Sequence, residues 1–210
     1  MQVAVVDYGS GNLRSVVRAL EYVGAKEVIV TSDPDALLAA ERVVFPGQGA
    51  IGSCMAALQQ NLLDAALAQV ANSCVPMLGI CIGLQVLFQT SEEDSGARGL
   101  GILQGDVRRF APDPAQHLKI PHMGWNQAHR MVDHPLWHGI RAEAWFYFVH
   151  SYFVVPRQSD IVAAHTEYGE TRFVSAVARD KLFAVQFHPE KSHDDGLRLL
   201  RNFLYWSGET

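Results

Sequence analysis

The sequence predicts an α/β fold of three layers, in which a mostly parallel sheet carries helices on both faces. The first half alternates short apolar runs with amphipathic segments, an order that produces parallel sheets covered by helices. The second half is richer in strand-like runs and closes with a helical segment. The 210 residues are 49% hydrophobic and 19% charged, without a linker-like stretch. Residues 1–210 are therefore expected to form a single domain.

The elements of the first half follow from their apolar periodicity. A helix is expected over 13–23, because Leu13, Val16, Val17, Leu20 and Val23 form one stripe. Further helices are expected over 34–40 and from about 53 to 70. Strands are expected at 3–6, 27–30 and 42–45, and a fourth apolar run, 74–78, leads into Cys81.

The second half predicts five further strands and one helix. The strands are expected at 107–110, 144–149, 161–165, 173–178 and 182–187. The closing helix has Leu197, Leu200, Phe203 and Leu204 on one face. Residues 91–121 between the two halves have a mixed, loop-rich pattern.

The strongest local signal is the segment Gly79-Ile80-Cys81-Ile82-Gly83. It is typical of a nucleophile elbow, where small residues allow a sharp turn from a strand into a helix, here expected from Cys81 to about Phe88. At a helix N-terminus the backbone N–H groups favour the thiolate form of a cysteine. A small core cysteine is the alternative, and it suits Cys54 and Cys74 better than Cys81. Cys81 is therefore predicted to be a nucleophile.

A second signal is the segment His188-Pro189-Glu190 at the end of the strand expected over 182–187. Residues two apart in an extended chain face the same side, so His188 and Glu190 are expected to point toward one pocket. A cysteine nucleophile needs a base and a group that orients the base. A surface histidine is the alternative, but the elbow at Cys81 favours a catalytic site. Both segments follow strands, and ligands of open α/β sheets bind beyond the carboxyl ends of strands.

These two motifs, Gly-x-Cys-x-Gly-x-Gln and Gln-Phe-His-Pro-Glu-Lys-Ser, resemble those of the triad-type (class I) glutamine amidotransferases. Further segments are similar to the glutaminase subunits of imidazole glycerol phosphate synthases, which serve histidine biosynthesis. They are residues 7–15, 46–49, 121–126 and 147–152. The resemblance extends from the first strand to the last helix. It implies hydrolysis of glutamine to glutamate and ammonia by Cys81, His188 and Glu190.

The resemblance also implies an oxyanion hole. Its donors are expected to be the backbone N–H of Ile82 and one N–H from the loop Gly47-Gln48-Gly49. The middle residue of this loop is usually valine in the family, and here it is Gln48. A plain tight turn is the alternative interpretation of the loop.

Contacts to glutamine are implied for Gln85, His150, Ser151 and Tyr152. A purely structural role for Gln85 or His150 is an open alternative, since Gln85 lies on the half-buried face of its helix and His150 ends an apolar strand.

The resemblance implies a partner that consumes the ammonia. This partner is a (β/α)8-barrel synthase subunit that makes imidazole glycerol phosphate and an aminoimidazole carboxamide ribonucleotide, and the two proteins form a heterodimer. The 210 residues have no room for such a barrel beside the glutaminase. Residues expected at the interface are Asn12, Arg14, Trp125 and Lys191, although a buried core position is an equal alternative for Trp125.

Composition argues against several other classes of protein. The net charge is −5 and no dense Lys/Arg cluster is present, so nucleic acid is not an expected partner. The longest apolar run, Cys74 to Leu84, is much shorter than the about 20 residues of a membrane span. No secretory leader is visible, and three cysteines without a Cys-x-x-Cys pair favour a reducing compartment, so a cytoplasmic protein is expected. No cofactor and no metal are expected, because His134 and His138 have no third ligand nearby.

Other functions stay open at this level. The nearest is a glutaminase subunit for pyridoxal phosphate, anthranilate or aminodeoxychorismate synthesis, but these relatives lack the segments at 8–12 and 122–126. A nucleotide-binding oxidoreductase is suggested by Gly9-Ser10-Gly11 with Asp33 downstream, but Arg14 occupies the third glycine position of that fingerprint. A catalytically inactive subunit conflicts with the intact Cys81, His188 and Glu190. A cysteine hydrolase acting on another substrate is harder to dismiss.

Overall fold

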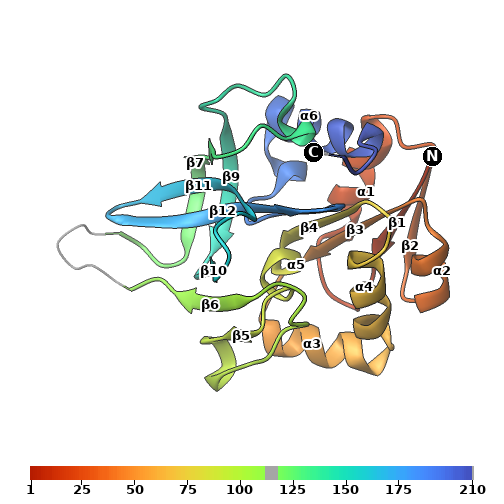
Figure 1. The fold of residues 1–210 in the computed structure, drawn as a ribbon, viewed down its shortest axis with the longest axis horizontal. Coiled ribbons are helices and arrows are strands. Elements are labelled where there is room, and N and C mark those ends of the chain that lie inside the picture. Colours follow the sequence, from red (N-terminus) through yellow and green to blue (C-terminus); the bar gives the residue numbers. More distant parts are fainter. Residues whose placement is uncertain (112–117, 210) are drawn as a thin grey trace.

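The structure, a computed structural model, describes residues 1–111 and 118–209. A mixed sheet runs through the molecule in the order β2-β1-β3-β4-β13-β12-β10-β6-β5 (Figure 1). Its parallel part consists of β1 (Gln2–Val6), β2 (Glu27–Thr31), β3 (Arg42–Gly47), β4 (Met77–Cys81) and β13 (Leu182–Val185). The last of these strands comes from the far end of the chain, and it pairs directly with β4.

The inner parallel strands β1, β3, β4 and β13 are buried on both faces, because their side chains alternate between two separate hydrophobic clusters, whereas the edge strand β2 is partly exposed. In β1, Val3 and Val5 belong to one cluster, whereas Ala4 and Val6 belong to the other. Helices α1 (Leu13–Tyr22) and α6 (His193–Tyr205) contribute to the first cluster. Helices α2 (Pro34–Ala39), α3 (Ile51–Gln60), α4 (Leu63–Ala71) and α5 (Ile82–Gln85) contribute to the second. The predicted α/β fold of three layers is confirmed.

The second half of the chain extends the sheet with antiparallel pairs. Its strands are β6 (Gly105–Arg109), β10 (Tyr152–Pro156), β11 (Val162–Tyr168), β12 (Thr171–Arg179) and the short β8 (His129–Arg130). The short β5 (Thr90–Ser91) precedes them in the chain and pairs with β6 in parallel. A separate two-stranded sheet is formed by β7 (His122–Gln127) and β9 (Trp145–His150). Three short 3-10 turns complete the described elements: η1 (Glu93–Ser95), η2 (Pro135–Trp137) and η3 (Pro189–Lys191).

Several local predictions need correction. The helix expected from about 53 to 70 is two helices, because Leu62 adopts a left-handed conformation with φ of 57°. The helix after Cys81 ends at Gln85 instead of Phe88. The strands β7 and β10 were not expected. Cys74 is exposed and is therefore no core residue. Part of the stretch expected to be loop-rich, 112–117, lies outside the described residues.

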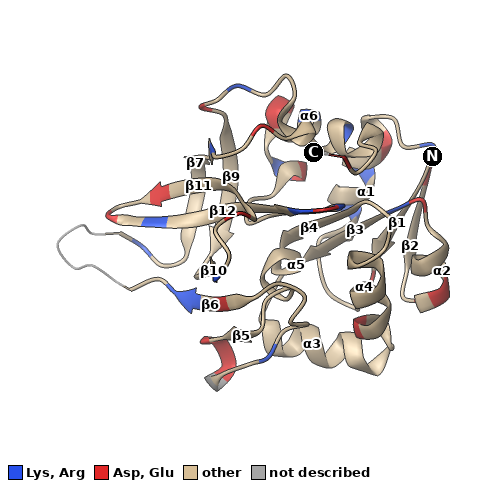
Figure 2. Ribbon diagram, in the orientation of Figure 1, with Lys and Arg blue, Asp and Glu red and all other residues tan. Residues whose placement is uncertain are grey.

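The order of the sheet brings three carboxyl ends together, those of β3, β4 and β13. Basic and acidic positions are both spread over many of the elements (Figure 2). Among the described residues, no helix combines the length and the apolar character that crossing a membrane requires.

Candidate active site

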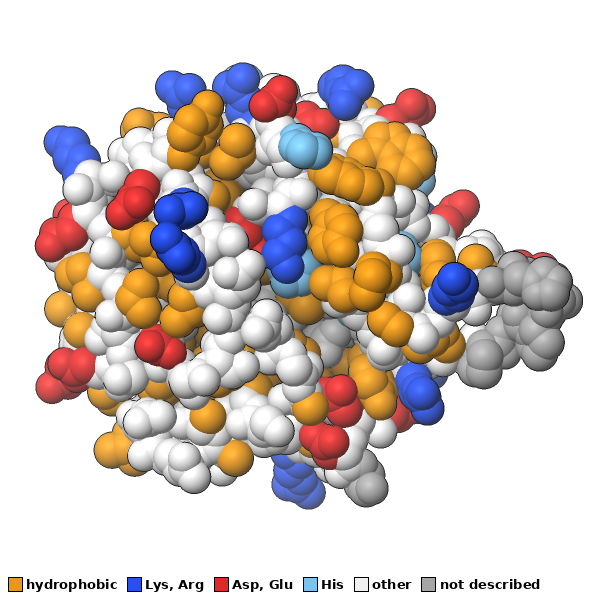
Figure 3. All heavy atoms as spheres, turned by 180° about the vertical axis from the view of Figure 1, so that it is seen from behind, with side chains coloured by type: hydrophobic (Ala, Val, Ile, Leu, Met, Phe, Trp, Pro, Cys, Tyr) orange, Lys and Arg blue, Asp and Glu red, His pale blue; other side chains and the backbone are white. Residues whose placement is uncertain are grey.

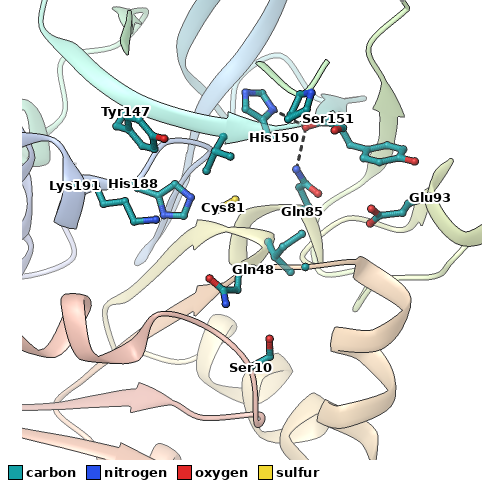
Figure 4. A pocket seen from close by; sticks show the side chains of 15 residues that line it. Ser10, Gln48, Cys81, Gln85, Glu93, Tyr147, His150, Ser151, His188 and Lys191 are labelled. Atoms are coloured by element: carbon teal, nitrogen blue, oxygen red, sulfur yellow. Dashed lines mark hydrogen bonds between the residues drawn. The ribbon is translucent and has the colours of Figure 1, made fainter. Parts of the chain in front are cut away.

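A cavity of about 590 Å³ opens at the carboxyl ends of β3, β4 and β13. Cys81 and His188 line it, together with side chains from β9 and β10 and from the loop after β3 (Figure 4). Most residues predicted for catalysis and for substrate contact line this cavity, namely 81, 82, 85, 150–152 and 188, whereas Glu190 does not line it. Segments distant in sequence therefore meet where ligands of α/β sheets usually bind.

Cys81 occupies a strained turn between β4 and α5. Its φ of 56° and ψ of −108° are unusual for a residue with a side chain. A Cβ atom on Gly79 would lie 2.7 Å from the carbonyl oxygen of Gly83, and one on Gly83 would overlap the carbonyl oxygen of Phe45. The two glycines are thus required by close backbone packing. Cys81 is only 5% exposed, so the turn places it at the floor of the cavity instead of at an exposed tip.

His188 and Glu190 form a hydrogen-bonded pair, with 2.9 Å between Nδ1 and Oε1. The expected extended geometry is wrong, because residues 189–191 form the turn η3. The turn still brings the two side chains together. The histidine is fixed from its backbone as well, since its N–H donates to the carbonyl of Tyr147 and its carbonyl accepts from the hydroxyl of Ser192.

The surroundings of His188 favour its protonated form. Burial by itself lowers the pKa of the imidazole, but the nearby Cys81 and Glu190 outweigh this effect and raise the pKa to about 10. Nε2 is buried without a hydrogen-bond partner among the described residues. The nitrogen next to the cavity is therefore available for proton transfer while Nδ1 is held by Glu190.

The loop after β3 lies beside the cavity, and Gln48 and Gly49 line it. Gly47 is buried and does not line the cavity, although it is level with Cys81 in the pairing of β3 with β4. The N–H of Gln48 donates to the hydroxyl of Tyr8 at 3.1 Å. The oxyanion role of this loop therefore stays a prediction.

Two glutamines link the cavity floor to β10 and β13. The side-chain amide of Gln85 donates to the carbonyl of Tyr152 and to Oε1 of Gln186, both at 3.0 Å. Gln186 in turn donates to Sγ of Cys81 at 3.7 Å. Gln186 is the first residue of the Gln-Phe-His-Pro-Glu-Lys-Ser motif, but the sequence assigned it no role in the site. Its contact with the sulfur depends on the pairing of β13 with β4.

Two cavity residues outside the predicted set are Glu93 and Tyr147. Glu93 accepts from the N–H of Ile51 at the start of α3, and burial raises the pKa of its carboxyl group. Tyr147 lies on β9 and packs against Trp125 across the two-stranded sheet. The sequence around Glu93 has no clear periodicity, so nothing in it predicted a residue of the site. Tyr147 belongs to the segment 147–152 that resembles the family, but no role was predicted for it.

His150 belongs to a chain of neutral side chains behind the cavity. Its Nδ1 lies 2.7 Å from the carbonyl of Tyr152, which can only accept, so Nδ1 carries the proton. Nε2 must then accept from Nδ1 of His122 at 3.0 Å, and Nε2 of His122 accepts from the amide of Asn126. Burial lowers the pKa to about 3 for His150 and to about 4 for His122. Both nitrogens of His150 are thus occupied by protein groups.

The four residues predicted at a partner interface lie at or near the surface. Asn12 and Arg14 are exposed at the start of α1, and Lys191 lines the cavity. Trp125 is 40% exposed and stacks on His193, so the alternative of a buried core tryptophan is wrong. On the face opposite to the view of Figure 1, hydrophobic side chains gather beside basic and histidine side chains (Figure 3).

No cluster of three or more metal-ligating side chains exists among residues 1–111 and 118–209. His134 is buried, and its Nδ1 accepts from the N–H of Leu136. This contact gives His134 a capping role in the turn η2.

Comparisons with known proteins identify the family of the chain. The sequence matches the family described as glutamine amidotransferase class-I over residues 4–206. The chain belongs to the class I glutamine amidotransferase family. The prediction of a glutamine amidotransferase is therefore confirmed at the level of the family, and the oxidoreductase alternative is wrong.

Similar proteins include subunits of imidazole glycerol phosphate synthase. The chain is 57% identical over 207 residues to the protein named imidazole glycerol phosphate synthase subunit HisH of Nitrosococcus oceani, with 98% of each chain covered. It is 54% identical over 211 residues to the protein of the same name from Nitrosomonas europaea, again with 98% of each covered. A solved structure of a putative GMP synthase subunit from Thermoplasma acidophilum shares the fold, with a TM-score of 0.72 at 22% identity over 97% of this chain and 92% of that one.

Proposed function

We propose that this protein hydrolyses glutamine to glutamate and ammonia and delivers the ammonia to a (β/α)8-barrel synthase subunit. The observation that carries the glutaminase reaction is the convergence of the Cys81 elbow and the His188–Glu190 pair on one cavity. The strained turn presents the sulfur, and the carboxylate of Glu190 holds Nδ1 of the imidazole so that Nε2 can exchange protons.

The reaction proceeds in two stages. The Cys81 thiolate attacks the carboxamide carbon of glutamine, the new S–C bond forms, and the carbonyl electron pair moves to oxygen. His188 donates its Nε2 proton to the nitrogen as the C–N bond breaks, and ammonia leaves. A water molecule then gives a proton to His188 and attacks the thioester, the S–C bond breaks, and glutamate and the thiolate are released.

The negative oxygen of each tetrahedral intermediate needs preorganised donors. Ile82 supplies one, because it is the first residue of α5 and N–H groups in a first helical turn have no partner within the helix. The loop 47–49 supplies the second after a change of its peptide orientation. Gln48 is exposed at the cavity rim, so its longer side chain in place of valine does not block this change.

Recognition of the amino-acid end of glutamine is assigned to the opposite part of the cavity. The carboxylate of Glu93 offers a negative partner for the α-ammonium group. Residues 150–152 line the same space, and their backbone is the suitable partner for the α-carboxylate, because both nitrogens of His150 are occupied. Gln85 orients this segment through the carbonyl of Tyr152.

Two observations support a barrel partner that consumes ammonia. The curated relatives at 57% and 54% identity over nearly the full length carry the name of an imidazole glycerol phosphate synthase subunit. In addition, Met123, Trp125 and Trp145 are 62%, 40% and 48% exposed. They share one face of the β7–β9 sheet with Tyr147 and Val149, which line the cavity. An apolar surface that borders the site of ammonia release is a suitable docking face for the protein that uses it. The products expected of the complex are imidazole glycerol phosphate and an aminoimidazole carboxamide ribonucleotide.

The test is ammonia release from glutamine by the purified chain, alone and with a barrel synthase and its nucleotide ligand. Hydrolysis that increases with both additions supports the proposal, and a Cys81→Ala control identifies the source of the ammonia. If the hydrolysis rate increases instead with a pyridoxal phosphate, anthranilate or aminodeoxychorismate synthase, that synthase is the partner that accepts the ammonia. Absence of hydrolysis under all conditions would refute the glutaminase itself.

A further inference from the structure

The hydroxyl of Tyr8 makes two hydrogen bonds to the backbone of the loop beside Cys81. It accepts from the N–H of Gln48 at 3.1 Å and donates to the carbonyl oxygen of the same residue at 3.3 Å. The N–H belongs to the peptide between Gly47 and Gln48, and the carbonyl belongs to the peptide between Gln48 and Gly49. One phenolic oxygen therefore holds both peptide units of the loop.

Tyr8 can fix the position of the loop because its own side chain is buried and closely packed. It follows β1, is only 4% exposed, and packs edge-on against Phe45 of β3. Burial raises the pKa of the phenol, so the group stays neutral and keeps both a proton to donate and lone pairs to accept. Tyr8 belongs to the second hydrophobic cluster, which also contains Ala4 and Val6, and it does not line the cavity that holds Cys81.

The direction of the Gln48 N–H therefore has a consequence for the reaction. This N–H points to a residue in the core, so it cannot at the same time donate to an oxyanion formed in the cavity. Gly47 is level with Cys81 in the β3–β4 pairing, which places the peptide after it beside the turn that carries Cys81. Gly49 has a φ of 90°, and a Cβ atom there would meet nothing within 4 Å, so the loop has backbone freedom and open space directly after Gln48. Gly47, by contrast, packs closely against Ile82 and Tyr8.

We propose that Tyr8 is a positioning residue that holds the Gly47–Gln48 peptide with its N–H turned away from Cys81. This inference rests on the proposed glutaminase reaction. Turning the peptide breaks the bond from the Gln48 N–H and brings the Gly47 carbonyl toward the same hydroxyl, which can then donate to it. The hydroxyl thus biases the loop toward the turned-away state without preventing the change.

A Tyr8→Phe variant tests the proposal, because it removes the oxygen and keeps the ring against Phe45. The variant removes two hydrogen bonds from the turned-away state and one from the turned-in state, and this net loss of one bond should raise the population of the turned-in state about five- to tenfold. The rate constant kcat of glutamine hydrolysis without a partner should increase by this factor, while KM changes less than about twofold, because the donor acts mainly on the transition state. Activity with the synthase and its ligand should change little, so the degree of activation should fall.

The matched control is Tyr22→Phe, which removes a phenolic hydroxyl from a residue that is 79% exposed at the end of α1. A second readout is independent of turnover: hydrogen exchange of the Gln48 amide, measured by NMR. Exchange should accelerate about five- to tenfold in Tyr8→Phe and stay unchanged in Tyr22→Phe.

The outcomes separate this proposal from the glutaminase function. If wild type hydrolyses glutamine but Tyr8→Phe has an equal or lower kcat without the partner, Tyr8 is only a structural residue and the proposal is overturned. A faster kcat with unchanged exchange of the Gln48 amide would also overturn it, because the gain would not come from this peptide. If wild type hydrolyses no glutamine with any partner, the proposed function fails, whatever the exchange experiment shows for the hydrogen bond.

Discussion

Cys81 keeps a backbone conformation that residues with side chains usually avoid, and the neighbouring glycines explain how the fold holds it there. Gly79 and Gly83 allow β4, α5 and β3 to approach so closely that the turn cannot relax. The same packing places the sulfur beside His188 and Gln186. At the scale of single residues, reactivity is therefore a result of backbone packing as much as of residue type.

Cys81→Ala should abolish glutamine hydrolysis, with a loss of at least about 10³-fold, because the covalent route disappears. Stability should change little, since the substitution removes one buried sulfur atom and leaves the φ of 56° with another residue that has a Cβ. We expect a decrease in Tm of about 2–4 °C, corresponding to about 1 kcal/mol. Steady-state kinetics and thermal unfolding check both parts. A variant within about tenfold of the wild-type rate would show that Cys81 is not the nucleophile.

Glu190→Gln should shift the pH dependence of kcat/KM. His188 must be protonated to release ammonia, so activity falls as the pH rises through the pKa of His188. Cys81 and Glu190 raise this pKa to about 10 against the effect of burial, and loss of the carboxylate charge removes part of the increase. The alkaline limit of the profile should move to lower pH by about one unit or more. An alkaline limit that stays in place would show that Glu190 does not set the pKa of His188.

At the scale of elements, the site depends on how the loop after β3, the elbow after β4 and the turn after β13 fit together. The glycines in the loop after β3 and in the elbow after β4 are required for different physical reasons. Gly49 has a positive φ and free space, whereas Gly83 lies against the carbonyl of Phe45 and Gly47 lies against Ile82 and Tyr8. A Cβ atom on Gly47 would be 2.7 Å from Cβ of Ile82. Alanine at Gly47 would thus disturb Ile82 by crowding rather than by restricting φ.

Gly83→Ala should destabilise the protein by about 3 kcal/mol or more, because its Cβ overlaps a backbone atom that cannot move without shifting β3. The control is Gly101→Ala, where φ is 66° and nothing lies within 4 Å of the added atom, so only a backbone strain of about 1–2 kcal/mol is expected. Urea denaturation gives both free energies of unfolding. Equal losses at the two positions would contradict the account of the elbow as a site of forced close packing.

At the scale of the whole molecule, several buried histidines are built into the core as neutral groups. His122 and His150 form the chain behind the cavity, and His134 caps the turn η2. Burial lowers the pKa to about 4 for His122 and His134 and to about 3 for His150. Protonation of these buried histidines at low pH should therefore destabilise the folded state.

Stability should therefore fall as the pH decreases from about 6.5 toward 4. In this range the unfolded chain binds protons with a histidine pKa of about 6.5, whereas the folded chain does not, and each such group costs up to about 1.4 kcal/mol per pH unit. His188 has the opposite sign, since its raised pKa contributes stability that is lost as the pH rises from about 6.5 through about 10. Urea denaturation across this range should give a maximum near pH 6.5.

His134→Asn should reduce the dependence of the free energy of unfolding on pH below about 6.5 by the equivalent of about one proton. The asparagine amide can keep the hydrogen bond that caps η2, and it does not bind a proton in this range. His129→Ala is the control, since His129 is exposed and should leave the slope unchanged. A free energy of unfolding that is constant between pH 7 and 5 would contradict the neutral buried histidines.

The amino-acid sequence by itself determined the α/β class and the family. Alternating apolar runs with two-residue and helical periods specify which faces must be buried, and this information is local. The glycines around Cys81 and the segment after 187 could also be interpreted from the local sequence. A sharp turn needs small residues, and a cysteine nucleophile needs a base. These local patterns predicted Cys81 and His188, and the family resemblance implied the further cavity residues 82, 85 and 150–152.

Tertiary structure decided what depends on contacts between distant segments. Gln186 contacts Cys81 only because β13 pairs with β4, and Glu93 reaches the cavity only because η1 caps α3. The two-stranded β7–β9 sheet likewise depends on pairing between two segments that are separate in the chain, whereas the break at the exposed Leu62 is a left-handed backbone conformation for which the apolar pattern gives no signal. The orientation of the Gln48 N–H toward Tyr8 also depends on tertiary structure, because a residue after β1 meets the loop after β3, 40 positions later in the chain.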